Sequence, residues 1–175
     1  DDRLEPILYD APTDLVCVTV ETYTARRSYQ IAAAFRARGV RVVLGGFHPT
    51  LFPDEASGQA DSIVIGEAEP VWRGLLADAA AGRLQARYHS DRPSLSGLAP
   101  DRSIFGNRRY GLVSLVETSR GCRFNCEFCS VSQFFRQRCL VRPVEEVVQE
   151  VRSLRKPVFF VDDNHFCFVI ADVSG

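Results

Sequence analysis

Three of the chain's six cysteines lie within residues 122–129, and their spacing constrains the fold and chemistry more than any other feature. They are Cys122, Cys126 and Cys129, which form a C-x3-C-x2-C pattern. Soft sulfur donors so close together select iron–sulfur clusters, zinc or copper(I) over hard cations. A structural zinc site is normally closed by four protein ligands, whereas three cysteines on a cubane cluster leave one iron open. The spacing therefore favours an iron–sulfur cluster with a vacant iron.

Two other interpretations of the cysteines stay open. Zinc could be bound with Cys139 or His165 as a fourth ligand, or the thiols could be unligated. An even number of cysteines would suggest disulfides in a small secreted protein. Here the chain is large enough to bury a core and half of its cysteines are clustered, so metal binding in a reducing compartment is the better explanation.

Composition excludes several classes of function. The chain has 46% hydrophobic and 25% charged residues, an ordinary balance for a globular protein, and its net charge is −1. No electrostatic signature of nucleic-acid or anionic-membrane binding is present. There is no apolar run long enough to span a bilayer and no signal peptide, so we expect a cytoplasmic protein. The chain lacks methionine even at position 1, which suggests that its natural N-terminus lies upstream.

Strand-like and helix-like segments alternate over residues 15–82. Residues 15–20 are a β-branched apolar run, typical of a strand buried on both faces of a parallel sheet, with Cys17 in the core. Residues 25–38 have helical spacing and end at Gly39. Further strands are predicted at 40–44 and 61–65, a short helix at 53–56 and a longer helix from Pro70 to Gly82.

This alternation predicts an α/β fold with a doubly wound sheet, which binds ligands at the carboxyl ends of its strands. Those ends are residues 21–24, the pair Gly45 and Gly46, and residues 66–67. Glycines there allow a ligand to approach the backbone closely, although they also occur in ordinary turns.

The second half begins with a strand-like run at 112–116 that leads into the cysteine loop. A helix at 143–154 and a strand at 158–161 follow, so the cysteines lie at the carboxyl end of a strand, where (β/α) barrels place their chemistry. Residues 83–111 lack periodicity. We therefore divide the chain into a first domain at 1–88, a linker at 89–111 and a second domain at 112–175.

The cysteine loop, with Phe128 directly before its third cysteine, resembles the signature of the radical S-adenosylmethionine (radical SAM) superfamily. The resemblance implies a [4Fe-4S] cluster on Cys122, Cys126 and Cys129, with S-adenosylmethionine on the fourth iron and Phe128 near the adenine. One electron from the cluster would cleave the sulfonium to a 5′-deoxyadenosyl radical. No catalytic residue beyond the cluster ligands is assigned.

Residues 13–82 resemble the cobalamin-binding domain of one class of this superfamily, and the resemblance rests on Gly45-Gly46-x-His48-x-Thr50, Asp61 and Gly66-Glu67-x-Glu69. It implies that Gly45 and Gly46 lie against the nucleotide tail of cobalamin. The sequence does not decide which residue, if any, coordinates cobalt. A lone histidine beside Pro49 is more often a loop-packing or helix-capping residue, and His48 is interpreted in that way.

In the same family the second barrel strand ends in an acidic pair that faces the adenosyl ligand, which assigns Asp162 and Asp163 to cofactor binding. The alternative is that Asp163 and Asn164 cap the next helix. Arg142 either helps to bind the ligand's carboxylate or, the preferred interpretation, is a solvated arginine at a helix end. Arg136 departs from the family, because a glycine is usual at its position.

These expectations combine into a partial Rossmann-like cobalamin-binding domain followed by the first βαβ unit of a truncated radical SAM (β/α) barrel. The resemblance implies methyl transfer or rearrangement on an unactivated carbon of a small-molecule or lipid-like substrate, with a flavodoxin or ferredoxin as electron donor. So few barrel elements predict little or no activity for this chain by itself. The alternative function is a non-catalytic zinc module using Cys122, Cys126, Cys129 and Cys139.

Overall fold

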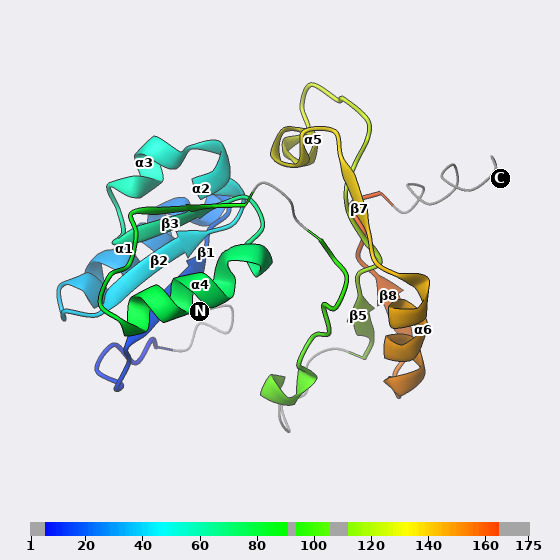
Figure 1. The fold of residues 1–175 in the computed structure, drawn as a ribbon, viewed down its shortest axis with the longest axis horizontal. Coiled ribbons are helices and arrows are strands. Elements are labelled where there is room, and N and C mark those ends of the chain that lie inside the picture. Colours follow the sequence, from blue (N-terminus) through cyan, green and yellow to red (C-terminus); the bar gives the residue numbers. More distant parts are fainter. Residues whose placement is uncertain (1–5, 91–93, 106–111, 165–175) are drawn as a thin grey trace. The chain divides into compact units, whose positions relative to one another are not determined.

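The structure is a computed structural model that describes residues 6–90, 94–105 and 112–164 (Figure 1). The chain divides into two compact units, residues 1–93 and 94–175. Among the described residues, no helix is both long enough and apolar enough to cross a membrane.

The first unit is built on a four-stranded parallel sheet in the order β1-β2-β3-β4. Its strands are β1 (Leu15–Thr19), β2 (Arg41–Gly45), β3 (Ser62–Ile65) and β4 (Arg87–His89). All neighbouring strands are parallel, so their carboxyl ends meet at one edge of the sheet. The α/β class and the parallel sheet predicted from the sequence are confirmed.

Helices cover both faces of this sheet (Figure 1). They are α1 (Ala25–Arg36), α2 (Phe47–Leu51), α3 (Pro53–Ser57) and α4 (Glu69–Ala80), with a short 3₁₀ turn at Thr22–Thr24. The two long helices lie where the sequence predicts them, each ending before a glycine with positive φ, Gly39 and Gly82. The five-residue helix α2 was not predicted, because its sequence Phe-His-Pro-Thr-Leu has no helical periodicity.

The two faces have separate cores because successive strand residues point to opposite sides. On one face, Val42 and Leu44 pack with Phe35 of α1 and Ala56 of α3. On the other face, Val43 and Val64 pack with Leu75 of α4 and Tyr88 of β4. This arrangement fixes the loops at the carboxyl edge of the sheet.

One prediction for the first unit was wrong. Cys17 is exposed rather than buried in the core, because it lies in β1, an edge strand whose alternate residues stay uncovered. Tyr88 contributes to the core from β4, which starts within the predicted first domain and ends within the predicted linker. β4 has only three residues, too few to show a strand pattern.

The second unit contains two pairs of strands. β5 (Ser114–Val116) is parallel to β8 (Val158–Phe160), and β6 (Ser119–Gly121) is antiparallel to β7 (Cys139–Val141). Its helices are α5 (Ser130–Phe135) and α6 (Val144–Ser153), and a 3₁₀ turn spans Arg102–Phe105. The pair β6 and β7, which brackets the cysteine loop, was not predicted.

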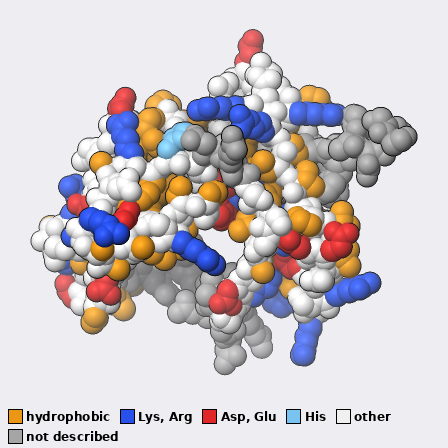
Figure 2. Space-filling model, viewed as in Figure 1, with side chains coloured by type: hydrophobic (Ala, Val, Ile, Leu, Met, Phe, Trp, Pro, Cys, Tyr) orange, Lys and Arg blue, Asp and Glu red, His pale blue; other side chains and the backbone are white. Residues whose placement is uncertain are grey.

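On the face drawn in Figure 2, the Lys and Arg side chains of the described residues are interspersed with Asp and Glu, and hydrophobic atoms lie between them. This distribution agrees with the net charge of −1 for the whole sequence. That the protein has no nucleic-acid partner stays a prediction.

Candidate functional site

The cysteine loop, residues 122–129, runs from the end of β6 to the start of α5. β6 follows β5 after only Glu117 and Thr118, so the loop leaves the carboxyl end of the parallel pair β5 and β8. Cys126 is exposed, whereas Cys122 and Cys129 are partly buried, and all three are free thiols.

Asp162 and Asp163 tie the start of this loop to the end of β8. The carboxylate of Asp162 accepts hydrogen bonds from the backbone amides of Thr118 at 2.6 Å and Ser119 at 2.9 Å, and also from the Thr118 hydroxyl. Asp163 accepts one from the backbone amide of Gly121 at 2.8 Å. The two residues predicted to face the adenosyl ligand therefore hold the segment from which the cysteines extend. The helix that Asp163 and Asn164 were predicted to cap would fall outside the described residues.

Gly121, directly before the first cysteine, lies where the side chain of any other residue would force neighbouring atoms to move. Its φ is +87°, and a Cβ atom would lie 2.3 Å from the carbonyl oxygen of Arg138 and 2.8 Å from Cγ of Phe135. The start of the cysteine loop thus packs directly against the end of α5. The sequence analysis missed this residue, and the only available signal was a glycine adjacent to the motif.

Two of the three cysteine side chains, Cys122 and Cys129, accept hydrogen bonds. Backbone amides of Ser132 and Val131, in the first turn of α5, lower the pKa of Cys129. The side-chain amide of Asn164 lies 3.2 Å from Sγ of Cys122 and donates to it. Such donors stabilise the thiolate form, which is the form that binds metals.

The donor set suits an iron–sulfur cluster chemically, because it consists of three soft ligands with donors that stabilise sulfur charge. Within the part of the chain that the structure describes, no three His, Cys, Asp or Glu side chains are gathered closely enough to hold a metal ion. The exposed loop would therefore have to close around a cluster. Phe128 is 94% exposed, and its role beside the adenine stays a prediction.

Cys139, the fourth ligand of the zinc alternative, lies in β7 opposite Gly121. A closed zinc site needs four ligands around one point, and the described residues do not provide such a group. His165, the other candidate, lies outside the described residues.

Arg142 is not the solvated helix-end arginine that was predicted, because its side chain is only 4% exposed. Its guanidinium donates to Glu150 at 2.6 Å, to the Glu117 carbonyl at 2.8 Å and to the Leu98 carbonyl at 3.0 Å. The backbone amide of Arg142 also donates to the Thr118 carbonyl at 2.9 Å. Arg142 therefore connects α6 and residues 94–105 to the segment before the cysteine loop.

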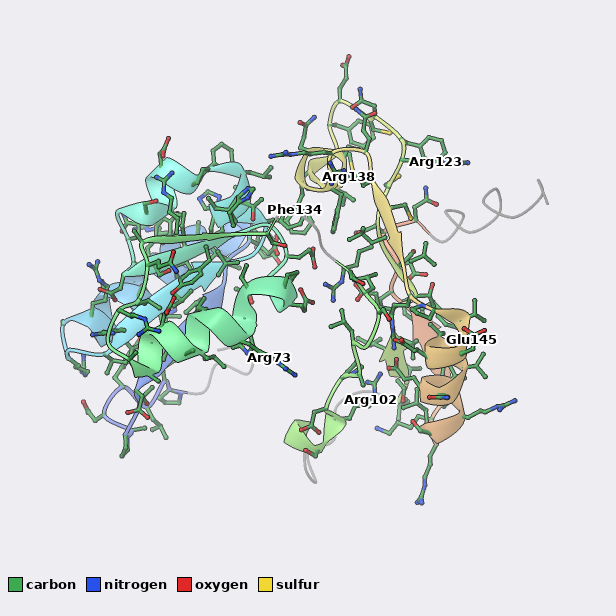
Figure 3. The ribbon with its side chains drawn as sticks, viewed as in Figure 1. Arg73, Arg102, Arg123, Phe134, Arg138 and Glu145 are labelled. Atoms are coloured by element: carbon green, nitrogen blue, oxygen red, sulfur yellow. The ribbon has the colours of Figure 1, made fainter. Side chains whose placement is uncertain are left out.

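Arg102 completes this network by binding Glu150 and the Leu115 carbonyl. Burial by itself would raise the pKa of Glu150, but the hydrogen bonds and charges of Arg142 and Arg102 outweigh it and hold this pKa below its ordinary value. A hollow of about 710 Å³ lies between residues 97–102 and α6. In Figure 3, Arg102 lies near β5, whereas Arg123 extends outward from the cysteine loop.

The carboxyl edge of the first unit brings together the loops that follow β1, β2 and β3. Thr50 connects two of them, because its hydroxyl donates to the Gly46 carbonyl at 2.8 Å and accepts from the Gly66 amide at 3.0 Å. A Cβ on Gly46 would lie 3.0 Å from the Val20 carbonyl oxygen, and its φ is +100°, so close packing within the chain itself requires this glycine. Gly45 has more room, with Val64 Cβ at 3.7 Å.

His48 is a packed residue of this edge, as the sequence interpretation held. It is 5% exposed, and its ring nitrogens lie 3.3 Å from the Thr22 hydroxyl and 3.2 Å from Glu55. The hydrogen bond from His48, followed by that from Tyr29, lowers the pKa of Glu55. His48 is thus engaged within the fold on both sides of its ring.

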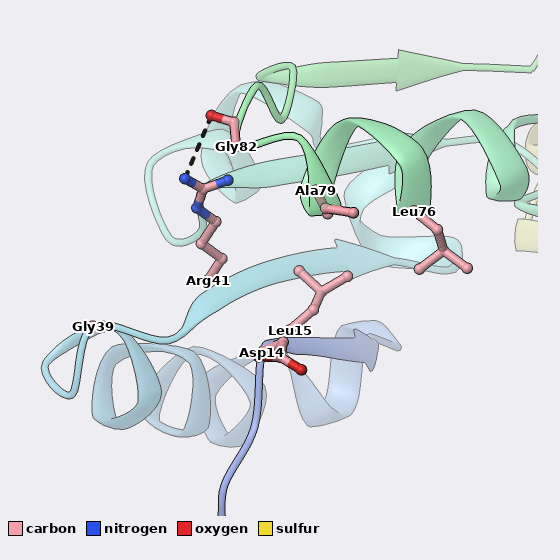
Figure 4. Close-up of a pocket in the computed structure, with 8 residues that line it drawn as sticks. Asp14, Leu15, Gly39, Arg41, Leu76, Ala79 and Gly82 are labelled. Atoms are coloured by element: carbon pink, nitrogen blue, oxygen red, sulfur yellow. Dashed lines mark hydrogen bonds between the residues drawn. The ribbon is translucent and has the colours of Figure 1, made fainter.

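A hollow of about 610 Å³ lies at the opposite, amino-terminal edge of the sheet (Figure 4). Leu15, Leu76 and Ala79 line it, and Arg41 donates there to the Gly82 carbonyl at 3.4 Å. It is therefore separate from the edge where the cofactor of the first unit was predicted.

Comparisons with known proteins agree with the motif. No protein-family model matches the chain. Bacteriochlorophyllide d C-8(2)-methyltransferase of Chlorobaculum tepidum is 37% identical over 163 residues, covering 89% of this chain and 36% of that protein. Bacteriochlorophyllide d C-12(1)-methyltransferase of the same bacterium is 29% identical over 164 residues, covering 86% and 36%.

Among solved structures, the radical S-adenosylmethionine methyltransferase TsrM from Kitasatospora setae matches with a TM-score of 0.66 and 20% identity, over 89% of this chain and 38% of that one. By sequence the chain is related to these methyltransferases, and its fold is similar to that of a radical SAM enzyme. Because these matches cover 86–89% of the chain, they extend over both of its units. The chain spans 36% of the length of the two methyltransferases.

Proposed function

We propose that this chain is the cofactor-binding part of a cobalamin-dependent radical SAM enzyme, with a [4Fe-4S] cluster on Cys122, Cys126 and Cys129. The observation that supports this most directly is the position of the three cysteines. They follow Gly121 at the joined carboxyl ends of β5 and β8, where a (β/α) barrel has its active site. In this proposal, β5 and β8 are the first two strands of that barrel.

S-adenosylmethionine would bind beside the cluster, which supplies the electron that cleaves it. Phe128 is exposed and therefore accessible to the adenine. One carboxylate oxygen of Asp163 accepts a hydrogen bond from the Gly121 amide, and the side chain is exposed. Its negative charge is therefore accessible to the ammonium group of S-adenosylmethionine. Asp162 supports the site indirectly, because both of its oxygens bind Thr118.

Cobalamin would bind at the carboxyl edge of the first unit, with its nucleotide tail against Gly45 and Gly46. Of the two glycines, Gly45 has space beside it, whereas Gly46 is required by its own contacts with β1. His48 would not coordinate cobalt, because its ring already contacts Thr22 and Glu55. The proposal therefore assigns His48 to holding the edge rather than to the metal.

The reaction of the complete protein would be methyl transfer, or a rearrangement, at an unactivated carbon of a small-molecule substrate, with a flavodoxin or ferredoxin as electron donor. The relatives named as methyltransferases favour methyl transfer. The fold supplies binding and orientation, while the cofactors supply the chemistry. We expect little or no 5′-deoxyadenosine from this chain alone, because the two barrel strands among the described residues would leave the cluster open to solvent.

Anaerobic reconstitution with iron and sulfide tests the proposal. We expect about four irons per chain and broad absorption near the blue edge of the visible spectrum. Cys122→Ser, Cys126→Ser and Cys129→Ser should each lower the iron content, whereas Cys17→Ser and Cys139→Ser, which change cysteines outside the motif, should not. A colourless protein that retains one zinc, lost again in Cys139→Ser, would instead establish the zinc module.

A further inference from the structure

Asn164 donates a hydrogen bond to a motif sulfur from outside the cysteine loop. Its Nδ2 lies 3.2 Å from Sγ of Cys122, and both residues are partly buried. The contact joins positions that are 42 apart in the sequence, so the fold rather than local geometry creates it.

The backbone before Asn164 is firmly held. Val161 donates to the Val116 carbonyl at 3.0 Å, which extends the pairing of β5 with β8 by one residue. Asp162 and Asp163 then bind the backbone of residues 118–121. The segment that ends at Asn164 is therefore hydrogen-bonded to β5 and to the backbone directly before the cysteine loop. These contacts hold the Asn164 amide next to Cys122.

The direction in which this contact shifts the reduction potential of a cluster follows from its chemistry. Hydrogen bonds to cluster sulfurs are among the factors that set the reduction potential of iron–sulfur centres. A donor stabilises negative charge on sulfur, and a reduced cluster carries one more negative charge than an oxidised one. Asn164 follows two aspartates, whose carboxylates would act in the opposite direction, so the neutral donor at this position is chemically distinct from its neighbours.

We propose that Asn164 is a positioning residue that raises the reduction potential of the cluster by donating a hydrogen bond to the Cys122 sulfur. The inference rests on the proposed function, because it requires Cys122 to be a cluster ligand. It goes beyond that function by identifying the residue that makes the cluster easier to reduce. No part of it depends on the substrate.

The test is a potentiometric titration of the reconstituted chain, followed by electron paramagnetic resonance of the reduced cluster. Asn164→Leu removes the donor at similar size and should lower the midpoint potential. At a fixed potential we expect the ratio of oxidised to reduced cluster to rise threefold to tenfold, tenfold corresponding to about 59 mV for one electron. Asn164→Asp has the native shape, lacks the donor and adds a charge, so it should lower the potential further. Asn164→Gln keeps the donor and should restore part of the shift.

Gln133→Leu is the matched control, because Gln133 is an exposed amide side chain of α5, outside the cysteine loop. Its potential should equal that of the wild type. If Asn164→Leu does not load iron, the isosteric Asn164→Asp still decides the question. An unchanged potential in the iron-loaded Asn164 variants overturns this inference alone. A wild-type chain that takes up no iron overturns the proposed function, and this inference with it.

Discussion

Gly121, directly before the cysteine loop, has no room for a side chain. In Gly121→Ala the new methyl would lie 2.3 Å from the Arg138 carbonyl oxygen, at a φ of +87°. Overpacking and the left-handed backbone together should lower the free energy of unfolding of the second unit by about 3 kcal/mol. The single tryptophan, Trp72, lies in the first unit, so its fluorescence does not report on unfolding of the second. Amide hydrogen exchange of residues 112–164 is therefore the appropriate measurement.

Gly97→Ala provides the control for this prediction. Gly97 has a φ of +76°, but no described atom lies within 4 Å of the position that a Cβ would take there. The substitution therefore isolates the backbone contribution of about 1 kcal/mol. Equal losses for the two variants would show that close packing against α5 is not what requires glycine at position 121.

Arg136 has the opposite mismatch, a bulky residue in a conformation suited to glycine. It follows α5 with φ 51° and ψ 48°, which is the left-handed region. Arg136→Gly should therefore stabilise the second unit by about 1 kcal/mol. Arg136→Ala, which removes the same charge but keeps the left-handed cost, should change stability by less than about 0.5 kcal/mol. Hydrogen exchange measures both, and equal effects would contradict the backbone explanation.

The sequence predicted the identity of the candidate ligands but not what holds them. The spacing of Cys122, Cys126 and Cys129 is visible in the chain itself. By contrast, the requirement for Gly121 depends on Arg138 and Phe135, and the burial of Arg142 depends on Leu98 and Glu150. Such contacts join residues distant in sequence, so no local pattern encodes them.

At the scale of elements, Glu150 of α6 joins residues 94–105 to the base of the cysteine loop through Arg102 and Arg142. Its side chain is 10% exposed, so Glu150→Gln would leave two arginines without their counter-ion. We expect the free energy of unfolding of the second unit to fall by about 3 kcal/mol at pH 7. Glu145→Gln, at an exposed position of the same helix (Figure 3), should cost less than about 0.5 kcal/mol.

The stability that the Glu150 carboxylate contributes should decrease as the pH falls. The pKa of Glu150 is lower in the folded chain than its ordinary value, so the carboxylate contributes stability above the ordinary pKa of about 4.3. That contribution is lost as the pH falls through the lower pKa of the folded state. The difference between wild type and Glu150→Gln should thus be constant from pH 7 to pH 6 and disappear in acid. A difference that grows on acidification would contradict the assignment.

Elements with an apolar run or a helical period were predictable, including the short strands β5 and β8, whereas β4, β6 and β7 were not. α1 and α4 are amphipathic and bounded by glycines, and β2 and β3 are apolar runs, so local sequence identifies them. β4, β6 and β7 have three residues each and exist because a neighbouring strand pairs with them. Strand pairing is a property of the fold. It positions Tyr88 through the pairing of β4 with β3, and the cysteine loop through the pairing of β6 with β7.

At the scale of the whole molecule, each proposed cofactor site is built from one unit. Thr50, Gly46 and Gly66 connect the edge loops of the first unit. Asp162, Asp163 and Asn164 hold the cysteine loop within the second. The sequence analysis placed a linker between two domains because apolar runs stop at residue 82 and resume at 112, and its domain boundaries stay a prediction. Residues 94–105 belong with the second unit through contacts between residues distant in sequence, among them the ion pair of Arg102 with Glu150 and the hydrogen bond from Arg142 to the Leu98 carbonyl.

Two sites built from separate units should load independently. Gly45→Ala places a methyl where the backbone is proposed to contact cobalamin, yet the chain itself can accept it, because the nearest atom is 3.7 Å away. We expect at least tenfold weaker binding of aquocobalamin, about 1.4 kcal/mol, with unchanged iron content. Conversely, Cys126→Ser should lose iron and retain cobalamin. Visible absorption of cobalamin after gel filtration, together with iron analysis, measures both. Loss of both cofactors in either variant would show that the two sites depend on each other.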